Sequence, residues 1–229
     1  MDFTKFVDLM DTQELFFPRA DNLGDPFEGS LPIRSANYRK YVIDRLVDQE
    51  KIKKEYKGAA SLQKDAESAL KEMAVSCWHM NDHESAAMWK LYLKSDEGIA
   101  IQSTYSNLVK VLDVSPISIN IGCVNYIDYE TQSINFGDAF APYVNKRKSF
   151  EHEKELRAVI WVKGYGNLEL CGPLIDGIRV KVSLNDLIER IYIAPNSPDW
   201  ILGLVQSVAG KYEISKNVIR SKLDERPVY

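Results

Sequence analysis

The first third of the chain has the hydrophobic spacing of amphipathic helices. In the segment 3–15, apolar residues return at near-helical intervals, which predicts a helix. The region 36–73 repeats this spacing among many charged residues, and Gly58 divides it into two predicted helices with solvated charged faces. Between these regions, the sequence Gly-Asp-Pro-Phe-Glu-Gly at 24–29 predicts a structured loop.

From residue 74 onward, short apolar runs that predict strands alternate with short helical segments. The predicted strands cover 74–78, 98–102, 119–126, 156–162, 168–171, 178–182, 191–193 and 217–223. The helices predicted here run from a cap at Asn81 or Asp82 to about residue 93, from a cap at 103–104 past residue 112, and over 143–149, 183–188 and 198–208.

Helices that come early and strands that come late are typical of an α+β fold. We therefore predict an antiparallel or mixed sheet with the N-terminal helices packed against it. We expect a single domain over 1–229, helix-rich over 1–73 and strand-rich over 74–229.

Composition excludes several classes of protein. The chain has 229 residues, a net charge of −4, 45% hydrophobic and 27% charged residues, as in ordinary globular proteins. Its longest uncharged stretch, 114–127, is shorter than the roughly 20 apolar residues of a membrane-spanning helix. Asp2 and the lack of an early apolar run argue against a secretory signal. We expect no membrane partner.

Cysteine usage and charge bear on compartment and partners. Three dispersed cysteines without a C-x-x-C pair form neither a disulfide framework nor a zinc ribbon, which predicts a cytoplasmic protein. The mild acidity argues against a broad nucleic-acid-binding coat, but it leaves a local basic groove open. The sequence does not indicate an oligomeric state.

The strongest local group of chemistry-bearing residues lies in 77–92. A helix starting near Asp82 would bring aromatic and polar side chains onto one face, either as a binding wall or as ordinary core. The candidates are Trp78, His79, Asn81, Glu84, Ser85, Trp89 and Tyr92.

The same segment raises the question of a metal. His79 and His83 are four residues apart, a spacing that suits a metal on one helix. However, His79 precedes the predicted helix and no H-E-x-x-H motif is present, so we expect no metal. A metal-dependent hydrolase or nuclease using these histidines and Glu84 is kept as an alternative.

A second charged group leads into a predicted strand. In an extended chain Glu153, Glu155 and Arg157 would point to one side. Two carboxylates placed together repel unless a cation or substrate lies between them, an arrangement that suits acid–base or cation-stabilising chemistry. The alternative is a structural ladder of ion pairs, with Arg157 on Glu155 and Lys148 on Glu151.

A third group consists of hydroxyl side chains where a predicted strand meets a helix. The backbone amides around Ser103 and Thr104 could bind an anion such as phosphate. The alternative is a simple N-cap. Neither a nucleotide-binding glycine motif nor a nucleophile-elbow motif is present.

Taken in order, these motifs resemble the uncharacterised bacterial family known as domain of unknown function 2971. The likeness covers nearly the whole chain and rests on residues 15–17, 25–29, 77–79, 84–85, 88–92, 98–101 and 150–157. It implies an occurrence in bacterial or phage genomes and a role in defence or as a toxin. Related chains carry a Trp-Arg-Tyr-like strand before the segment that matches 2–6, so either the start lies upstream or that strand is missing.

A weaker likeness is to ADP-ribosyltransferases, which have a strand ending in Ser-Thr and a later Glu-x-Glu. It implies NAD as the substrate and ADP-ribosyl transfer or glycohydrolysis as the reaction, through an oxocarbenium-like sugar. Glu155 would stabilise the sugar cation, Glu153 would activate the acceptor and Ser103 would orient Glu155. The other candidates would bind substrate: Trp78, His79, Asn81, Glu84, Ser85, Trp89, Tyr92, Thr104, Lys148 and Arg157.

We therefore expect a cytoplasmic protein with one pocket formed by these residues and directed at NAD or another nucleotide. The leading alternative is a non-catalytic binding or sensor module, in which the same polar residues only maintain the fold.

Overall fold

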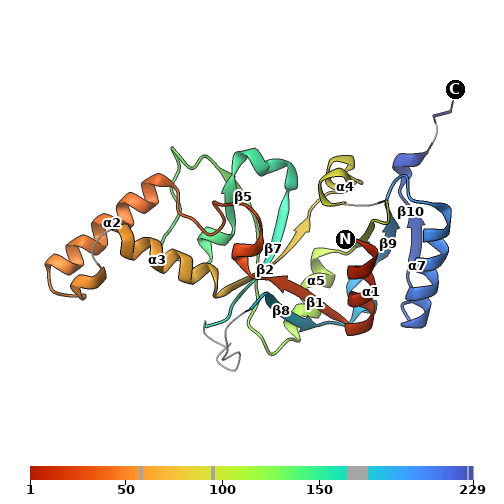
Figure 1. Cartoon of the computed structure of the whole chain (residues 1–229), viewed down its shortest axis with the longest axis horizontal. Helices are drawn as coiled ribbons and strands as arrows, with labels where there is room; N and C mark the ends of the chain where they lie inside the picture. The colour runs from red at the N-terminus through yellow and green to blue at the C-terminus, as the bar shows by residue number, and fades with distance from the viewer. Residues whose placement is uncertain (57–58, 94–95, 164–174, 226, 229) are drawn as a thin grey trace. The chain divides into compact units, whose positions relative to one another are not determined.

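A computed structural model describes residues 1–56, 59–93, 96–163, 175–225 and 227–228 (Figure 1). The side chains of residues 59–62 are also outside the description. The chain forms two compact units, each assembled from separated stretches. The first unit contains 1–16, 81–116 and 179–229, and the second contains 17–80 and 117–178. The prediction of a single domain stays a prediction.

The first unit is built on a three-stranded mixed sheet. β9 (Arg190–Ile193) lies in the middle, parallel to β10 (Asn217–Arg220) and antiparallel to β3 (Ile99–Gln102). The helices of this unit are α1 (Phe3–Thr12), α4 (Ala86–Tyr92), α5 (Tyr105–Asp113), α6 (Leu184–Leu187) and α7 (Asp199–Lys211), followed by the 3-10 turn η5 (Lys222–Asp224).

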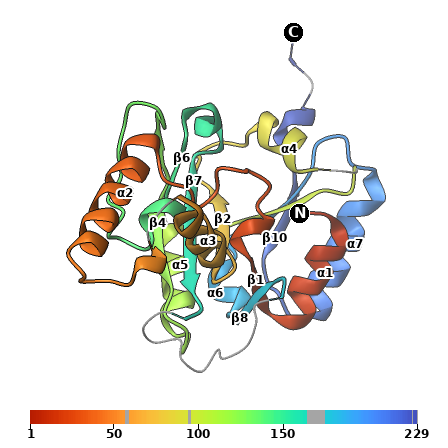
Figure 2. The ribbon, with the colours of Figure 1, turned by 60° about the vertical axis from the view of Figure 1, so that its left-hand side comes forward.

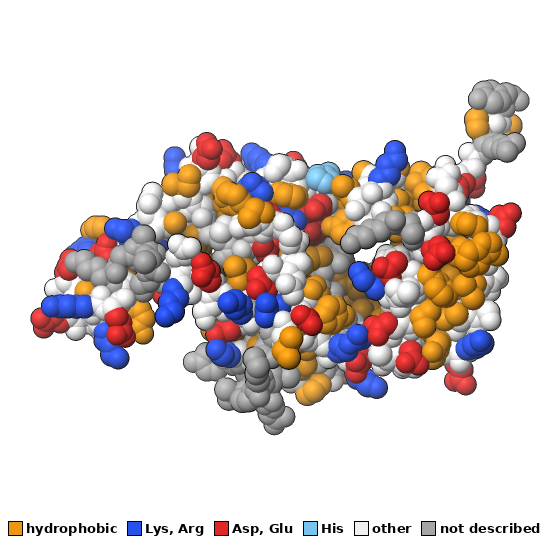
Figure 3. Space-filling view, viewed as in Figure 1, with side chains coloured by type: hydrophobic (Ala, Val, Ile, Leu, Met, Phe, Trp, Pro, Cys, Tyr) orange, Lys and Arg blue, Asp and Glu red, His pale blue; other side chains and the backbone are white. Residues whose placement is uncertain are grey.

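The core of the first unit lies between this sheet and its helices. Ile191 and Ile193 of β9 and Ile201 and Val205 of α7 are fully buried. Since these positions alternate on the strand and are four apart on the helix, each element buries one face. The outer side of α7 leaves Trp200 exposed, and Figure 3 shows apolar side chains gathered over this helix.

The second unit is built on an antiparallel three-stranded sheet. β7 (Glu155–Trp161) is its middle strand and pairs with β2 (Met73–His79) and β4 (Asn120–Cys123). β5 (Asn125–Ile127) and β6 (Asn145–Arg147) form a parallel pair. Its helices are α2 (Ile33–Asp48) and α3 (Ala59–Leu70), with the 3-10 turns η1 (Ala20–Asn22), η2 (Lys54–Tyr56), η3 (Ala141–Tyr143) and η4 (Lys148–Glu153).

β1 (Glu14–Pro18) and β8 (Gly177–Lys181) form a further two-stranded sheet, and each strand contains a boundary between the units. With its antiparallel and mixed sheets, the structure confirms the predicted α+β class. No helix among the described residues is both long and apolar enough to cross a bilayer.

Several predicted elements differ from the structure. The helix predicted from Asn81 or Asp82 begins only at Ala86, because the side chain of Ser85 accepts the capping bond from Met88 N. The helix predicted over 143–149 is wrong: residues 145–147 form β6, since they pair with β5.

The strand predicted over 119–126 is divided into β4 and β5, which pair with different partners. The strand predicted at 168–171 lies outside the described residues.

Candidate functional site

The second unit buries a cluster of charged side chains beneath its main sheet. Glu155 and Arg157 alternate along the central strand β7, so both point to the same face. Glu155 is 4% exposed and Arg157 is 1% exposed. Arg157 Nε donates to Glu155 Oε2 over 2.5 Å. Two residues that are neighbours on the same face of a buried strand therefore form a direct ion pair.

The rest of the Arg157 guanidinium is also engaged. Nη1 donates to Glu28 Oε1 over 2.6 Å, and Nη2 donates to Glu28 Oε2 over 3.1 Å. Nη1 also donates to the carbonyl oxygen of Tyr143 over 2.7 Å. This bidentate geometry is the strongest form of an arginine–carboxylate contact.

Lys146 closes the other end of the cluster. Its Nζ lies 3.3 Å from Glu155 Oε1 and also donates to Glu153 Oε2. We call these five side chains the buried charge network: Glu28, Lys146, Glu153, Glu155 and Arg157. Three carboxylates face two cations, so the network has one more negative charge than positive charges when every group is ionised.

The pKa shifts of the three carboxyl groups in the network differ in direction. Burial raises the pKa of Glu153. The hydrogen bond from Lys146 lowers this pKa and the neighbouring Glu155 raises it, so the net shift is upward. Burial also raises the pKa of Glu28. Burial opposes ionisation of Glu155, but the charges of Arg157 and Lys146 hold its pKa below the ordinary value. Glu155 is therefore the firmly ionised member, whereas burial favours the protonated forms of Glu28 and Glu153.

The loop that carries Glu28 is held by its own contacts. Asp25 Oδ1 accepts from Phe27 N over 3.0 Å, and Glu28 N donates to the carbonyl of Asp25 over 2.9 Å. Arg147 Nη2 donates to the same Asp25 oxygen over 2.8 Å, and its guanidinium lies 4.0 Å from the centre of the Phe27 ring. Gly29 follows with φ of +66°, a conformation that favours glycine. These contacts confirm the predicted structured loop.

Sequence reasoning missed Glu28 and Lys146 as members of this cluster. Glu28 lies in a motif interpreted as a structured loop and as part of the family likeness, with no role given to its side chain, and Lys146 lies in a segment predicted to be helical. A buried strand that contains Glu and Arg was the available signal, because such charges need partners from elsewhere in the chain.

The structure distributes the predicted site residues over both units. In the second unit lie Trp78, His79, Lys148, Glu153, Glu155 and Arg157. In the first unit lie Asn81, Glu84, Ser85, Trp89, Tyr92, Ser103 and Thr104.

Within the second unit, some of the predicted residues lie at the buried charge network and others do not. His79 Nδ1 lies 2.5 Å from the carbonyl oxygen of Glu153, beside the network, and Trp78 Nε1 donates to Ser76 Oγ over 3.2 Å. Glu153 is the last residue of η4, and Lys154 has a left-handed backbone conformation. The prediction that the chain is extended from Glu153 to Arg157 is therefore wrong. The lysine that joins the network is Lys146, whereas Lys148 is exposed.

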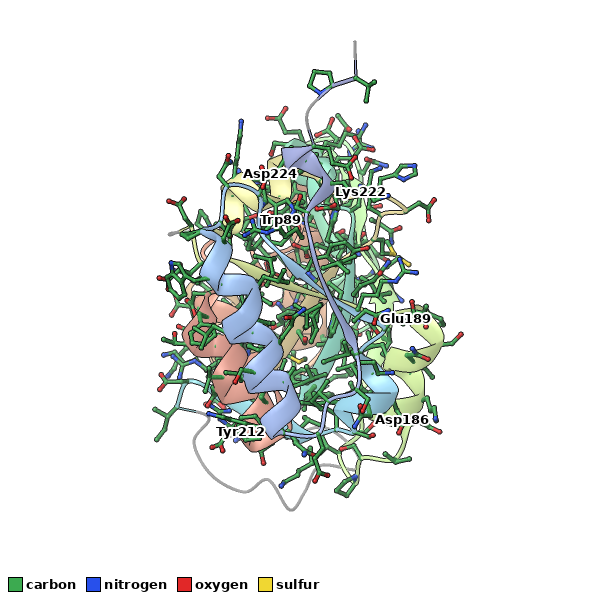
Figure 4. The ribbon with its side chains drawn as sticks, turned by 90° about the vertical axis from the view of Figure 1, so that its right-hand side faces the viewer. Trp89, Asp186, Glu189, Tyr212, Lys222 and Asp224 are labelled. Atoms are coloured by element: carbon green, nitrogen blue, oxygen red, sulfur yellow. The ribbon has the colours of Figure 1, made fainter. Side chains whose placement is uncertain are left out.

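Within the first unit, Glu84 links two elements. Its Oε2 accepts from Trp89 Nε1 over 3.2 Å, and its Oε1 accepts from the backbone N–H of Lys222 over 2.8 Å. Figure 4 shows Trp89, Lys222 and Asp224 together at the end of the unit where α4 meets η5. A cavity of about 540 Å³ lies here, and Trp89, Lys90, Asp96, Asn196 and Asp224 are among its lining residues.

The hydroxyl side chains in the first unit make local bonds. Ser103 Oγ donates to the carbonyl of Leu187 over 2.6 Å. Thr104 caps α5 by accepting from Asn107 N over 3.1 Å. The N-cap alternative for Thr104 is therefore confirmed, while the orientation of Glu155 by Ser103 stays a prediction.

Metal-ligating side chains do not gather in the described residues. No three His, Cys, Asp or Glu side chains there come together as a metal site. His79 belongs to the second unit, whereas His83 and Glu84 belong to the first.

Comparison with protein families, with curated proteins and with solved structures finds no match to this sequence.

Proposed function

We propose that this chain is a ligand-binding module in which the buried charge network stabilises the second unit and does not perform catalysis. One observation carries the proposal. Both carboxylate oxygens of Glu155 are already occupied by cations of the network, Lys146 on Oε1 and Arg157 on Oε2. A carboxylate that stabilises a substrate cation has to contact that substrate, and Glu155 is only 4% exposed.

The cavity beside Trp89 in the first unit is the proposed ligand site. Its volume of about 540 Å³ lies in the ordinary range for small-molecule sites. Trp89 supplies an aromatic ring, Lys90 a cation, and Asp96 and Asp224 supply hydrogen-bond acceptors. This set of groups suits a nucleoside or a short nucleotide: the ring for the base, the carboxylates for sugar hydroxyls and the lysine for a phosphate.

Replacing Glu155 tests the structural role of the network. Glu155→Gln leaves Arg157 and Lys146 without their shared anion, so we expect the free energy of unfolding at pH 7 to fall by about 3 kcal/mol or more. Urea unfolding followed by circular dichroism measures it. The matched control is Asp8→Asn, which removes the exposed pair with Arg179 and is expected to cost less than about 1 kcal/mol.

The stability of the Glu155→Gln protein distinguishes a structural carboxylate from a functional one. A Glu155→Gln protein as stable as the native chain contradicts the proposal, because carboxylates kept for function are commonly neutral or stabilising when replaced.

A second candidate function is NAD-directed ADP-ribosyl transfer or glycohydrolysis, with Glu155 stabilising the sugar cation and Glu153 activating the acceptor. The surplus negative charge of the network favours it, because a positively charged transition state would be attracted there. The likeness to domain of unknown function 2971 connects this candidate with defence or toxin roles.

Calorimetric titration with NAD and an assay of nicotinamide release test the second candidate. Turnover by the native chain that is lost in Glu155→Gln, with folding retained, would support it. Absence of both NAD binding and turnover in the native chain would remove it.

A further inference from the structure

One side of α2 in the second unit carries a regular row of aromatic and basic side chains. Arg34, Tyr38, Tyr41 and Arg45 follow the spacing i, i+4, i+7 and i+11, which places them on one helix face. All four are exposed, and the two tyrosines are 59% and 56% exposed. We call these four residues the α2 stripe. Figures 1 and 2 show α2 at the margin of its unit.

The rings of the stripe are arranged as a platform. Tyr38 and Tyr41 are stacked, with ring centres 6.4 Å apart and planes 22° apart. Phe136 meets Tyr38 edge-on at 5.7 Å. Arg45 lies 5.8 Å from the centre of the Tyr41 ring and donates to its hydroxyl over 3.3 Å.

A buried contact fixes this platform in place. Ser35 Oγ donates to the carbonyl of Ile134 over 2.9 Å and accepts from its N–H over 2.8 Å. This reciprocal pair holds the loop that contains Phe136 against the start of α2. The aromatic surface therefore exists before any ligand arrives, which lowers the ordering cost of binding.

The local charge is opposite in sign to that of the whole chain. Residues 33–56 contain seven Lys and Arg against four Asp and Glu, a net charge of +3 in a chain of net charge −4. Arg34 forms no ion pair within the part of the chain that the structure describes. The two arginines of the stripe are separated by eleven positions, or about 16 Å of helix.

We propose that the α2 stripe binds single-stranded nucleic acid. Bases stack on Tyr38 and Tyr41, because every base has a face that can stack on an aromatic ring. Arg34 and Arg45 contact phosphates on either side of the stacked bases. Their separation of about 16 Å along the helix spans several nucleotides of one strand, since successive nucleotides are roughly 3.4 Å apart. The occupant is a nucleic acid strand because the stripe pairs exposed aromatic rings with unneutralised positive charge and has little aliphatic surface.

The α2 stripe belongs to the second unit and the cavity beside Trp89 to the first, so nucleic-acid binding by the stripe does not depend on a ligand in the cavity. The native chain is titrated into fluorescein-labelled dT12, U12 and a 12-base-pair duplex, with binding followed by fluorescence anisotropy. We expect single strands to bind more tightly than the duplex. Two phosphate contacts predict an affinity about sevenfold lower at 200 mM than at 50 mM salt.

Two paired variants test the rings and the charges separately. Tyr38→Ala with Tyr41→Ala should weaken single-strand binding at least about tenfold, whereas the equally exposed Tyr105→Ala in the first unit should leave it unchanged. Arg34→Ala with Arg45→Ala should remove most of the salt dependence. Lys181→Ala with Lys211→Ala removes the same charge elsewhere and should not.

The proposal is wrong if the native chain does not bind either single strand at 50 mM salt. It is equally wrong if binding survives the double tyrosine change, or if the duplex binds as tightly as the single strands. All substituted positions are exposed, and circular dichroism confirms that each variant is folded before titration.

Discussion

Arg157 and Glu28 lie 129 residues apart in the sequence and meet through two parallel hydrogen bonds, of 2.6 Å and 3.1 Å. Through this contact the loop after η1 is attached to the central strand of the second unit. Both side chains are almost fully buried, so water cannot replace either partner when the other is removed. The pair therefore couples the folding of two distant segments.

Arg157→Met is expected to lower the free energy of unfolding by about 3–5 kcal/mol, because it leaves Glu28 buried without its cation and removes one of the two cations that contact Glu155. Equilibrium urea unfolding at pH 7 measures the loss. Arg179→Met, which removes an exposed arginine from its pair with Asp8, serves as the control and should cost less than about 1 kcal/mol. Equal effects of the two changes would contradict the importance of burial.

Glu153 and Glu155 are expected to respond to pH in opposite directions. The pKa of Glu153 is raised in the folded chain, so the stability that it contributes is complete below its ordinary pKa and is lost as pH rises through its folded pKa. The pKa of Glu155 is lowered, so its contribution is present above its ordinary pKa and is lost as pH falls through its folded pKa.

Urea unfolding at pH 4, 6 and 8 measures this opposition. Relative to the native chain, Glu153→Gln should gain stability as pH rises, because glutamine avoids the cost of ionising a buried group. Glu155→Gln should lose stability over the same interval. Parallel curves for the two variants would contradict the opposite pKa shifts of Glu153 and Glu155.

Local sequence pattern predicted the α+β class and most elements. The helical periodicity of α1 follows from the one face that it buries, whereas β7 is recognisable as a short, mostly apolar run because it is buried on both faces. The error at 143–149 has a long-range cause. Residues 145–147 have helix-compatible local spacing, but they are strand because β5 supplies their hydrogen-bond partners.

For the candidate site too, local spacing predicted the contacts within one strand but not those between distant segments. Glu155 and Arg157 were identified from their own strand, and the ion pair between them was one of two alternatives that local spacing allowed. Glu28 could not be paired with Arg157 from local spacing, because nothing near either residue specifies the other. The cavity beside Trp89 likewise requires the segment around Asp224 to return from the end of the chain.

Gly29 is expected to tolerate substitution less well than Gly24. Both have positive φ, so alanine is strained at either position by roughly 1–2 kcal/mol. At Gly29 a Cβ would also lie 2.7 Å from Leu70 Cδ2 and 2.9 Å from Tyr143 Cε1, whereas at Gly24 nothing lies within 4 Å. Gly29→Ala should therefore cost about 1–3 kcal/mol more than Gly24→Ala in urea unfolding. Equal costs would mean that the neighbouring side chains move aside freely.

The cavity in the first unit is expected to bind a nucleoside-type ligand through Trp89. Calorimetric titration with adenosine and with adenosine monophosphate measures binding to the native chain. Trp89→Ala removes the ring proposed to stack on the base and should weaken both ligands about tenfold. Lys90→Ala should weaken only the monophosphate, since adenosine carries no phosphate for the lysine to contact.

Trp200→Ala is the matched control for the cavity, because this exposed tryptophan lies on α7 and is not among the residues that line it. It should bind both ligands as the native chain does. With both variants shown to be folded by circular dichroism, equal weakening by Trp89→Ala and Trp200→Ala would show that the loss is not specific to the cavity, and unaltered binding in Trp89→Ala would place the ligand elsewhere. Either result would contradict a site at Trp89, whereas selective loss of the monophosphate in Lys90→Ala would orient the ligand with its phosphate toward α4.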